Sequence, residues 1–372
     1  MIDRALTLSS TLVASLALLI TGCGNDSQTS ETDSSTAARS ETGSGSENEE
    51  TNESTRAPLH IGVSIPAATH GWPAGVGWWA KEAQDQYDES EVIWEFQRAG
   101  SAAEQASQIE AMLEKGIEGL VVLPFDSDTP LPAIQRAKDQ GVYIVSVDRG
   151  LREPIADIYI AGDNPGFGRE SANFMVNKLN GAGDIVILRG MQVEIDTERY
   201  EAAMEVFNEN PDITILDVQH GNWNRADAHR VMQDFLTRYD HIDAVWASDD
   251  DMALGVEQAI RDVGREGEMW ILGGAGMKDI VKRVMENDPL YPADITYPPA
   301  MIAAGVHLAV ANLRDGNELA VYDRIPAHLR LDRDVLHESA GEAEPGQRHI
   351  KLDVHLITPE NAEEFYFPDS VY

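Results

Sequence analysis

From Leu59 onward, short apolar runs rich in β-branched residues alternate with segments whose apolar residues recur every three or four positions. The first pattern is typical of buried strands and the second of amphipathic helices. Strands are predicted at residues 60–65, 92–97, 119–124, 142–147, 157–162, 184–189, 213–219, 243–248, 268–273 and 293–297. Helical patterns, such as residues 102–115 and 225–239, lie between most of these strands.

This alternation predicts an α/β fold class. Strands that alternate with helices form parallel sheets with helices packed on both faces. A longer interval without a predicted strand begins at AGDNPGFG, residues 161–168. Five predicted strands precede this interval and five follow it. We therefore expect two parallel-sheet lobes that follow one another along the chain.

The N-terminal pattern is different and predicts export. Residues 5–20 form an uncharged apolar run preceded by Arg4. These 16 residues suit the core of a signal peptide, whereas a membrane-spanning helix needs about 20. The end of the run, LLITGC, resembles the lipobox of bacterial lipoproteins, in which Cys23 would be lipidated. A cleaved signal with an incidental cysteine is the alternative for residues 1–23, but a lone cysteine cannot form an internal disulfide.

Residues 24–57 read as an acidic linker rich in Ser, Thr and Glu. Between residues 25 and 56 there is no Val, Leu, Ile, Met or aromatic residue. Such a segment buries too little apolar area to offset its ordering entropy, so we expect it to be disordered. It would tether a folded domain to a membrane anchor.

The charge balance excludes one class of partner. The chain has 28 basic and 64 acidic residues, a net charge of −36. Nucleic acid is excluded, because binding it requires Lys and Arg to displace counterions from phosphate. Nine acids and three bases precede Ala57, so about −30 belongs to the folded part. This excess favours a salt-adapted protein, and a merely acidic protein is the alternative.

The candidate chemistry lies at the carboxyl ends of the predicted strands, where open parallel sheets bind ligands. The polar and aromatic residues there, or at the start of the next helix, are His70, Trp72, Phe125, Asp126, Asp128, Asp148, Arg149, Arg199, Trp223, Asp249, Asp250, Asp251 and Tyr297. Carboxylates accept hydrogen bonds from hydroxyls, guanidiniums donate them, and aromatic rings pack on C–H faces. The sequence shows no Ser-His-Asp, Cys-His or metal-ligand set, so we expect a binding protein that uses no cofactor or metal and is not an enzyme.

Several motifs resemble one family as an ordered series. They are VLPFDSDTPLPAIQRAKDQGVYIVSVDRG, AGDNPGFG, TERYEAAMEVF, WASDDDMALGVEQAI, ILGGAGMKDIVKRV and DITYPPAMIAAGV. The series resembles the type I periplasmic sugar-binding proteins of ABC importers, the ribose- and galactose-binding group, over nearly all of residues 59–314. LacI-type repressors share this fold, but they carry an N-terminal helix-turn-helix where this chain has an export signal.

The resemblance implies two similar doubly wound parallel-sheet lobes joined by a hinge that closes on a ligand. The N-terminal lobe would comprise residues 58–162 plus about 298–330, and the C-terminal lobe residues 163–297 plus part of 331–372. The ligand-binding residues that it implies are His70, Trp72, Asp148, Arg149, Arg199, Trp223, Asp249 and Tyr297. Near Arg199 the alignment can slip, which leaves Thr197 and Asp196 as alternatives. Ala275 replaces a carboxylate that is usual in the family.

Several of these candidates also have a purely structural interpretation. Asp148 and Arg149 could form a surface ion pair, and Trp72 and Trp223 could pack in a core. The three acids at 249–251 could cap a helix, with Asp249 alone also binding ligand. A metal at these acids is disfavoured, because consecutive residues at a helix start rarely converge on one ion.

Together these patterns predict an extracytoplasmic lipoprotein anchored in a membrane, in the periplasm or at the cell surface. As a monomer, it would capture a monosaccharide or polyol and deliver it to an ABC permease. The alternatives are a sensor of a sugar or an autoinducer that presents its ligand to a histidine kinase or chemoreceptor, and a sugar-modifying enzyme of the same architecture.

Overall fold

The computed structural model describes residues 56–68, 71–326, 329 and 347–372. The predicted signal peptide with Cys23, nearly all of the predicted linker and His70 lie outside these residues. Within the described ranges, no helix has both the length and the apolar character that crossing a membrane requires.

The first sheet has six strands, and every neighbouring pair is parallel. Across the sheet the order is β11 (Arg348–Leu352), β5 (Ile158–Gly162), β4 (Tyr143–Val147), β3 (Gly119–Val122), β1 (Leu59–Pro66) and β2 (Val92–Ala99). All four residues of β3 are buried, as expected of a parallel strand that is covered on both faces.

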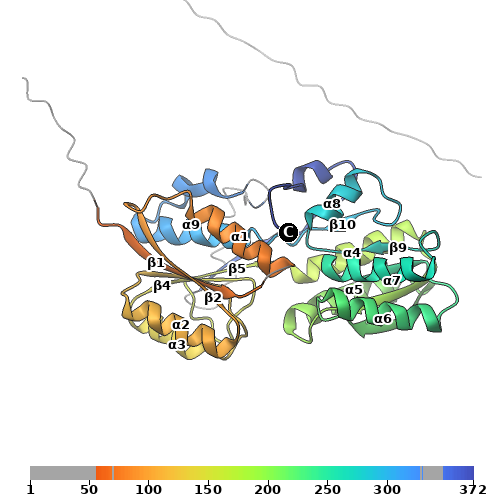
Figure 1. Ribbon diagram of the computed structural model, residues 1–372, viewed down its shortest axis with the longest axis horizontal. Helices are drawn as coiled ribbons and strands as arrows, with labels where there is room; N and C mark the ends of the chain where they lie inside the picture. The colour runs from red at the N-terminus through yellow and green to blue at the C-terminus, as the bar shows by residue number, and fades with distance from the viewer. Residues whose placement is uncertain (1–55, 69–70, 327–328, 330–346) are drawn as a thin grey trace, which may run out of the picture. The chain divides into compact units, whose positions relative to one another are not determined.

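Helices cover both faces of this sheet (Figure 1). On one face lie α2 (Ala102–Glu114) and α3 (Leu131–Asp139), and on the other lie α1 (Trp72–Gln84) and α9 (Met301–Arg314). The short helix η1 (Glu318–Arg324) packs against α9. Pro73 lies in the first turn of α1, where its fixed φ suits the helix.

The second sheet has four parallel strands in the order β7 (Ile213–His220), β6 (Gly183–Arg189), β8 (Ala244–Trp246) and β9 (Trp270–Leu272). Its helices are α4 (Asn164–Lys178), α5 (Glu194–Glu209), α6 (Arg225–Arg238), α7 (Asp250–Val263) and α8 (Lys278–Met285). Helix α4 packs against α5, and α6 against α7. The side chains of Asp163, Asn224 and Asp249 cap the N-termini of α4, α6 and α7, and a cap of this kind satisfies amides that the helix leaves unpaired.

The last predicted strand differs from its neighbours. It forms the two-residue β10 (Asp294–Ile295), which pairs antiparallel with β12 (Leu356–Ile357) and belongs to neither large sheet. The short helix η4 (Ala362–Phe365) packs against α8 nearby. Two prolines, Pro298 and Pro299, follow this strand before α9 begins. Because proline has no backbone N–H to donate to a ladder, neither residue can continue the pairing.

All ten strands predicted from the sequence are present, and the two main sheets are parallel with helices between their strands. The predicted α/β fold with two lobes is therefore confirmed. Strands β11 and β12 were not predicted. Strand β11 extends the first sheet beside β5, and β12 pairs only with β10.

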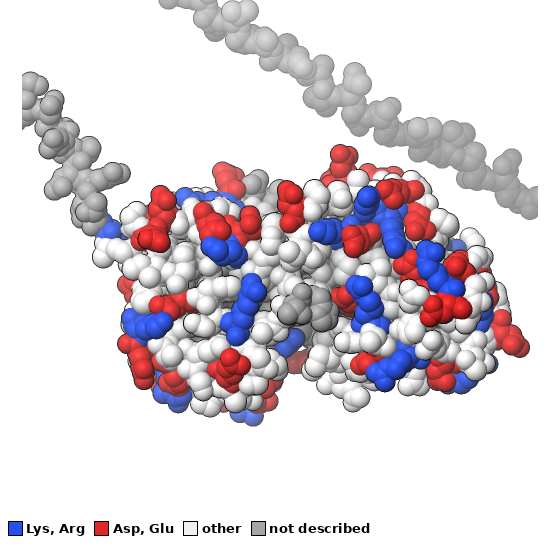
Figure 2. Space-filling view, viewed as in Figure 1, with Lys and Arg blue, Asp and Glu red and all other residues white. Residues whose placement is uncertain are grey.

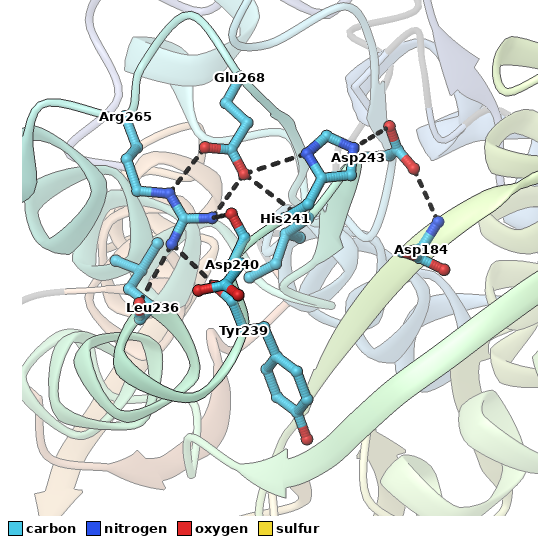
Figure 3. A network of polar contacts seen from close by, with 9 residues as sticks. Asp184, Leu236, Tyr239, Asp240, His241, Asp243, Arg265 and Glu268 are labelled. Carbon is cyan, nitrogen blue, oxygen red and sulfur yellow. Dashed lines mark hydrogen bonds and ion pairs between the residues drawn. The ribbon is translucent and has the colours of Figure 1, made fainter.

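A polar network joins two loops at the ends of α6 and α7 (Figure 3). Arg265 Nε donates to Glu268 Oε2 at 2.7 Å, and Arg265 Nη1 donates to the carbonyls of Leu236 and Tyr239 at 3.1 Å each. Glu268 Oε1 also accepts from the backbone N–H of Ile242 at 3.0 Å. These hydrogen bonds, led by the one from Arg265, lower the pKa of Glu268 to about 2.

Charges of both signs share the surface. On the face drawn in Figure 2, Lys and Arg side chains are interspersed with Asp and Glu side chains. The acidic excess is therefore not gathered into a single patch on this face.

Candidate ligand-binding site

A cavity of about 470 Å³ lies at the carboxyl ends of strands from both sheets. From the first lobe it is lined by Ala67, Ala68, Gly71, Trp72, Pro73, Asp148 and Arg149. From the second lobe and the segment after β10 it is lined by Met191, Ile195, Arg199, Asn222, Trp223, Asp249, Asp251, Ala275 and Tyr297. The structure thus brings together every predicted ligand-binding residue that it describes.

Asp148 lies directly after β4 and is 4% exposed. Its Oδ1 accepts a hydrogen bond of 2.8 Å from the Tyr297 hydroxyl, and its Oδ2 lies 3.9 Å from Arg149 Nε. Burial raises the pKa of this carboxyl, while Arg149, Tyr297 and Arg199 act in the opposite direction. Its backbone has φ +66° and is held by the Tyr159 hydroxyl, which donates to the Asp148 carbonyl at 2.8 Å.

Arg199 is 7% exposed, and its position is fixed by three contacts. Its Nε donates to Asn164 Oδ1 at 2.9 Å. Its guanidinium carbon lies 4.2 Å from the ring centre of Phe167 and 4.3 Å from that of Tyr297. A guanidinium between two aromatic rings is stabilised by cation–π attraction and presents its remaining N–H groups in a fixed plane.

The two alternatives to Arg199 lie elsewhere. Thr197 is exposed. Asp196 accepts hydrogen bonds from the side chain of Arg189 and, at 2.7 Å, from the backbone N–H of Gly190. Of the three residues, only Arg199 lines the cavity.

Trp72 and Tyr297 form an aromatic corner that joins the first lobe to the segment after β10. The indole Nε1 of Trp72 donates to the Tyr297 carbonyl at 2.7 Å, and the ring centres lie 5.9 Å apart. The indole is half-buried and faces the cavity. Its N–H is satisfied by the protein, so its ring face is the part left to contact a ligand.

Trp223 lies on the second lobe, directly after Asn222 at the end of β7. Both residues have positive φ, +51° and +58°. A Cβ on Gly190 would lie 2.1 Å from the Trp223 ring, so only glycine lets the indole lie on the backbone there. This packing holds the half-buried Trp223 ring against the cavity wall.

Asp249 both caps α7 and lines the cavity. Its Oδ1 accepts from the backbone N–H of Met252 at 2.9 Å, and the residue is 7% exposed. Burial raises its pKa to about 7. Asp251, for which the sequence favoured a structural role, also lines the cavity, and it accepts from Arg225 at 2.8 Å.

The polar residues after β3 have structural contacts and do not line the cavity. Asp126 accepts from the backbone N–H groups of Asp128 and Thr129 at 3.0 and 2.6 Å. Asp128 pairs with Arg152 at 2.7 Å. The carbonyl of Phe125 accepts from Arg149 Nη1 at 2.6 Å, so this loop orients the arginine that faces the cavity.

Comparison with known proteins identifies the family. A family model described as a periplasmic binding protein domain matches residues 61–318. The chain belongs to this family. The family predicted from the sequence is therefore confirmed, and its members are substrate-binding proteins and not enzymes. Membership also implies a location outside the cytoplasm.

Individual relatives share 30% or less of their aligned residues with this chain in the examples that follow. A xylitol-binding protein of Mycolicibacterium smegmatis is 30% identical over 213 residues, which cover 56% of this chain and 60% of the relative. A D-allose-binding periplasmic protein of Escherichia coli is 26% identical over 243 residues, 63% of this chain and 77% of the relative. A solved solute-binding protein from Actinobacillus succinogenes with bound D-allose superposes with a TM-score of 0.67 at 21% identity, covering 82% of this chain and 99% of that one.

Several residues that shape the cavity were not singled out by sequence reasoning. Asn164 and Phe167 fix Arg199, and both lie in AGDNPGFG, which was recognised as a motif without a role for its side chains. Met191 and Ile195 line the cavity from the loop after β6 and the start of α5. They carry no pattern that distinguishes them from ordinary surface or core residues.

The described part of the chain contains no group of three or more His, Cys, Asp or Glu side chains arranged to hold a metal ion. The cavity instead combines buried carboxyls, fixed guanidiniums and two indole faces. Such a set can exchange many hydrogen bonds with a small polar molecule and exclude water from its apolar faces.

Proposed function

We propose that this chain is an extracytoplasmic solute-binding lipoprotein that captures a monosaccharide or polyol between its two lobes and delivers it to an ABC permease. The observation that carries the proposal is the meeting of Asp148, Arg199, Trp72 and Trp223 in one cavity of about 470 Å³. Residues from both lobes line that cavity, so a ligand in it contacts both.

The chemistry of these residues matches a polyhydroxylated ligand. Hydroxyl groups donate to the carboxyl of Asp148 and accept from the guanidiniums of Arg149 and Arg199, and hydrogen bonds to charged groups are about twice as strong as neutral ones. Trp72 and Trp223 offer ring faces to the C–H faces of a sugar. Two relatives are named as a xylitol-binding protein and a D-allose-binding protein, and these names support this class of ligand.

A thermal-shift screen tests the ligand class. Pentoses, hexoses and polyols, including xylitol and D-allose, are compared with amino acids. A ligand that binds only the folded protein at a hundredfold excess over its Kd adds about 2.7 kcal/mol of stability. A shift with amino acids and none with sugars or polyols would show that the proposed ligand class is wrong.

The variant Asp148→Asn assigns the site. Asparagine keeps an oxygen for the Tyr297 hydroxyl but loses the charge, so we expect the ligand-induced shift to disappear. Asp139→Asn is the matched control, because Asp139 is exposed at the end of α3 and should leave the shift unchanged. A full shift in Asp148→Asn would remove Asp148 from the binding site.

The anchor is tested separately in cells. Cys23 is the single cysteine of the chain, so Cys23→Ser removes the only residue that the proposed lipid can modify. We expect the wild type to incorporate labelled fatty acid and the variant to incorporate none. Absence of label in the wild type, or equal labelling of the variant, would exclude a lipid on Cys23.

A further inference from the structure

Two carboxyls that the proposed binding mechanism does not use lie together behind the cavity. Asp250, the first residue of α7, and Asp294, the first residue of β10, are both 0% exposed. Their side chains lie within hydrogen-bonding reach of each other. No Lys, Arg or His among the described residues forms an ion pair with either one.

Both carboxyls hold the same loop. Asp250 accepts from the backbone N–H groups of Gly274 and Met277 at 2.8 and 2.7 Å. Asp294 accepts from the backbone N–H of Gly276 at 3.2 Å. The loop between β9 and α8, residues 273–277, is therefore attached to the pair through three of its amides. Asp250 approaches so closely that a Cβ on Gly273 would lie 2.1 Å from its Oδ1.

The pair is connected to three parts of the cavity wall. Ala275, in the middle of this loop, lines the cavity with φ +108° and donates its N–H to the Ile295 carbonyl at 2.7 Å. Asp249 directly precedes Asp250, and Tyr297 follows two residues after β10. A displacement of the pair would therefore reach Ala275, Asp249 and Tyr297.

We propose that Asp250 and Asp294 share one proton and act as positioning residues that hold the 273–277 loop, so that ligand affinity falls when this proton is lost. Two carboxylates within hydrogen-bonding distance, buried and without a cation, repel each other strongly, and such pairs retain a proton. Loss of the proton replaces the hydrogen bond between them with repulsion and loosens the loop. The effect on affinity rests on the proposed function, whereas the effect on the loop does not.

Other titratable groups face the pair, and the effects of their titration must be distinguished from those of the pair. Burial, together with the charge of its partner for Asp250, raises the pKa of both carboxyls. Asp249 and Asp251 flank Asp250 at the start of α7. Burial raises the pKa of Tyr372, and the charges of the pair, Asp249 and Asp251 raise it further. Burial and the charge of Glu257 raise the pKa of Tyr291, and the charge of Asp250 adds to this rise. The two protons of the pair belong to the pair as a whole, so a variant is needed to assign them.

Hydrogen exchange of the ligand-free protein is the first test. Protection of the Gly274, Gly276 and Met277 amides, corrected for their intrinsic exchange rates, should fall at least about tenfold between about pH 6 and pH 9. In Asp294→Asn the side chain can still donate to Asp250 but does not titrate, so the fall should disappear. A fall that persists in Asp294→Asn, or none in the wild type, would overturn the proposal.

Ligand affinity is the second test, with xylitol and D-allose as probes. In the wild type, affinity should decline by up to about tenfold per pH unit above the pKa of the shared proton. Asp294→Asn should abolish this decline, and Asp139→Asn should retain it. If Asp249→Asn abolishes the decline and Asp294→Asn does not, Asp249 is responsible and the proposed pair is not. If neither probe binds but exchange follows the expected pattern, the pair stands, and xylitol and D-allose are both excluded as ligands of the proposed function.

Discussion

Replacing Tyr297 with phenylalanine removes one hydroxyl group and leaves the aromatic corner in place. The ring contacts with Trp72 and Arg199 remain, as does the hydrogen bond from Trp72 Nε1 to the residue 297 carbonyl. The variant loses only the 2.8 Å hydrogen bond to Asp148 Oδ1. Because both residues are 4% exposed, no bulk water replaces the lost donor.

The expected magnitude follows from the charge and burial of this pair. A hydrogen bond to a charged group contributes about 1.5–3 kcal/mol, so the free energy of unfolding should fall by that amount above the pKa of Asp148. If a ligand depends on the orientation of Asp148, its affinity should fall by about ten- to a hundredfold, since 1.4 kcal/mol is about a factor of ten.

The pH dependence of ligand binding should change in a direction that a simple loss of packing would not produce. The Tyr297 hydroxyl lowers the pKa of Asp148, although burial raises this pKa overall. Without the hydroxyl the pKa rises further. A ligand that needs the carboxylate is lost as pH falls through this pKa, so the loss should begin at a higher pH in Tyr297→Phe than in the wild type.

Urea unfolding and calorimetric titration of the ligand, each repeated across the acid and neutral range, measure these effects. Tyr366→Phe is the matched control, because the structure gives the half-buried Tyr366 hydroxyl no hydrogen bond within the described residues. An unchanged unfolding free energy, affinity and pH profile in Tyr297→Phe would refute the role of this hydroxyl in holding Asp148.

Three further predictions concern stability. His307 is 0% exposed and accepts at Nδ1 from, or donates to, the Tyr87 hydroxyl at 2.8 Å, and burial lowers its pKa from 6.5 to about 4. As pH falls, the imidazole is therefore protonated in the unfolded chain before it is protonated in the folded protein, and the free energy of unfolding should fall by up to about 3 kcal/mol between pH 6.5 and about pH 4. Urea unfolding of His307→Asn should lack this part of the decline. A decline equal to that of the wild type would contradict the lowered pKa of His307. The lowered pKa of Glu268 stabilises the fold above its unfolded value of 4.5, and this stability is lost as pH falls to about 2. Because the side chain is 23% exposed, Glu268→Gln should cost only about 1 kcal/mol at neutral pH, and the difference from the wild type should vanish near the lower value. Finally, the excess negative charge of the folded part predicts that the thermal midpoint rises as sodium chloride is raised from low to high concentration; a midpoint independent of salt would contradict salt adaptation.

The fold and the location of the candidate site could be predicted from the sequence, and the reason is physical. Strands buried on both faces read as short apolar runs, and the polar residues that follow them lie at the edge where parallel strands end. Asp148, Arg149 and Trp223 could therefore be placed near one another before their contacts were known, and the cavity does bring them together. That they bind a ligand stays a prediction.

The contacts that orient these residues could not be predicted, because they join distant parts of the chain. The hydroxyl of Tyr297 reaches Asp148 across 149 positions, and Arg199 reaches Asn164 across 35. No local pattern marks either partner. The antiparallel pairing of β10 with β12 is of the same kind, because it depends on where the chain returns after β11.

Backbone strain shows how much of the site depends on such distant contacts. Among the described non-glycine residues, Asp148, Asn222, Trp223 and Ala275 combine a positive φ with a place in the cavity wall. A non-glycine residue in such a conformation costs about 1–3 kcal/mol and persists only where its surroundings enforce it. Here the enforcing groups are distant, such as the Tyr159 hydroxyl on the carbonyl of Asp148 and the Ile295 carbonyl on the N–H of Ala275. The wall of the cavity is thus held in shape by the fold as a whole, and residue types at the strand ends predict the chemistry of the site but not its geometry.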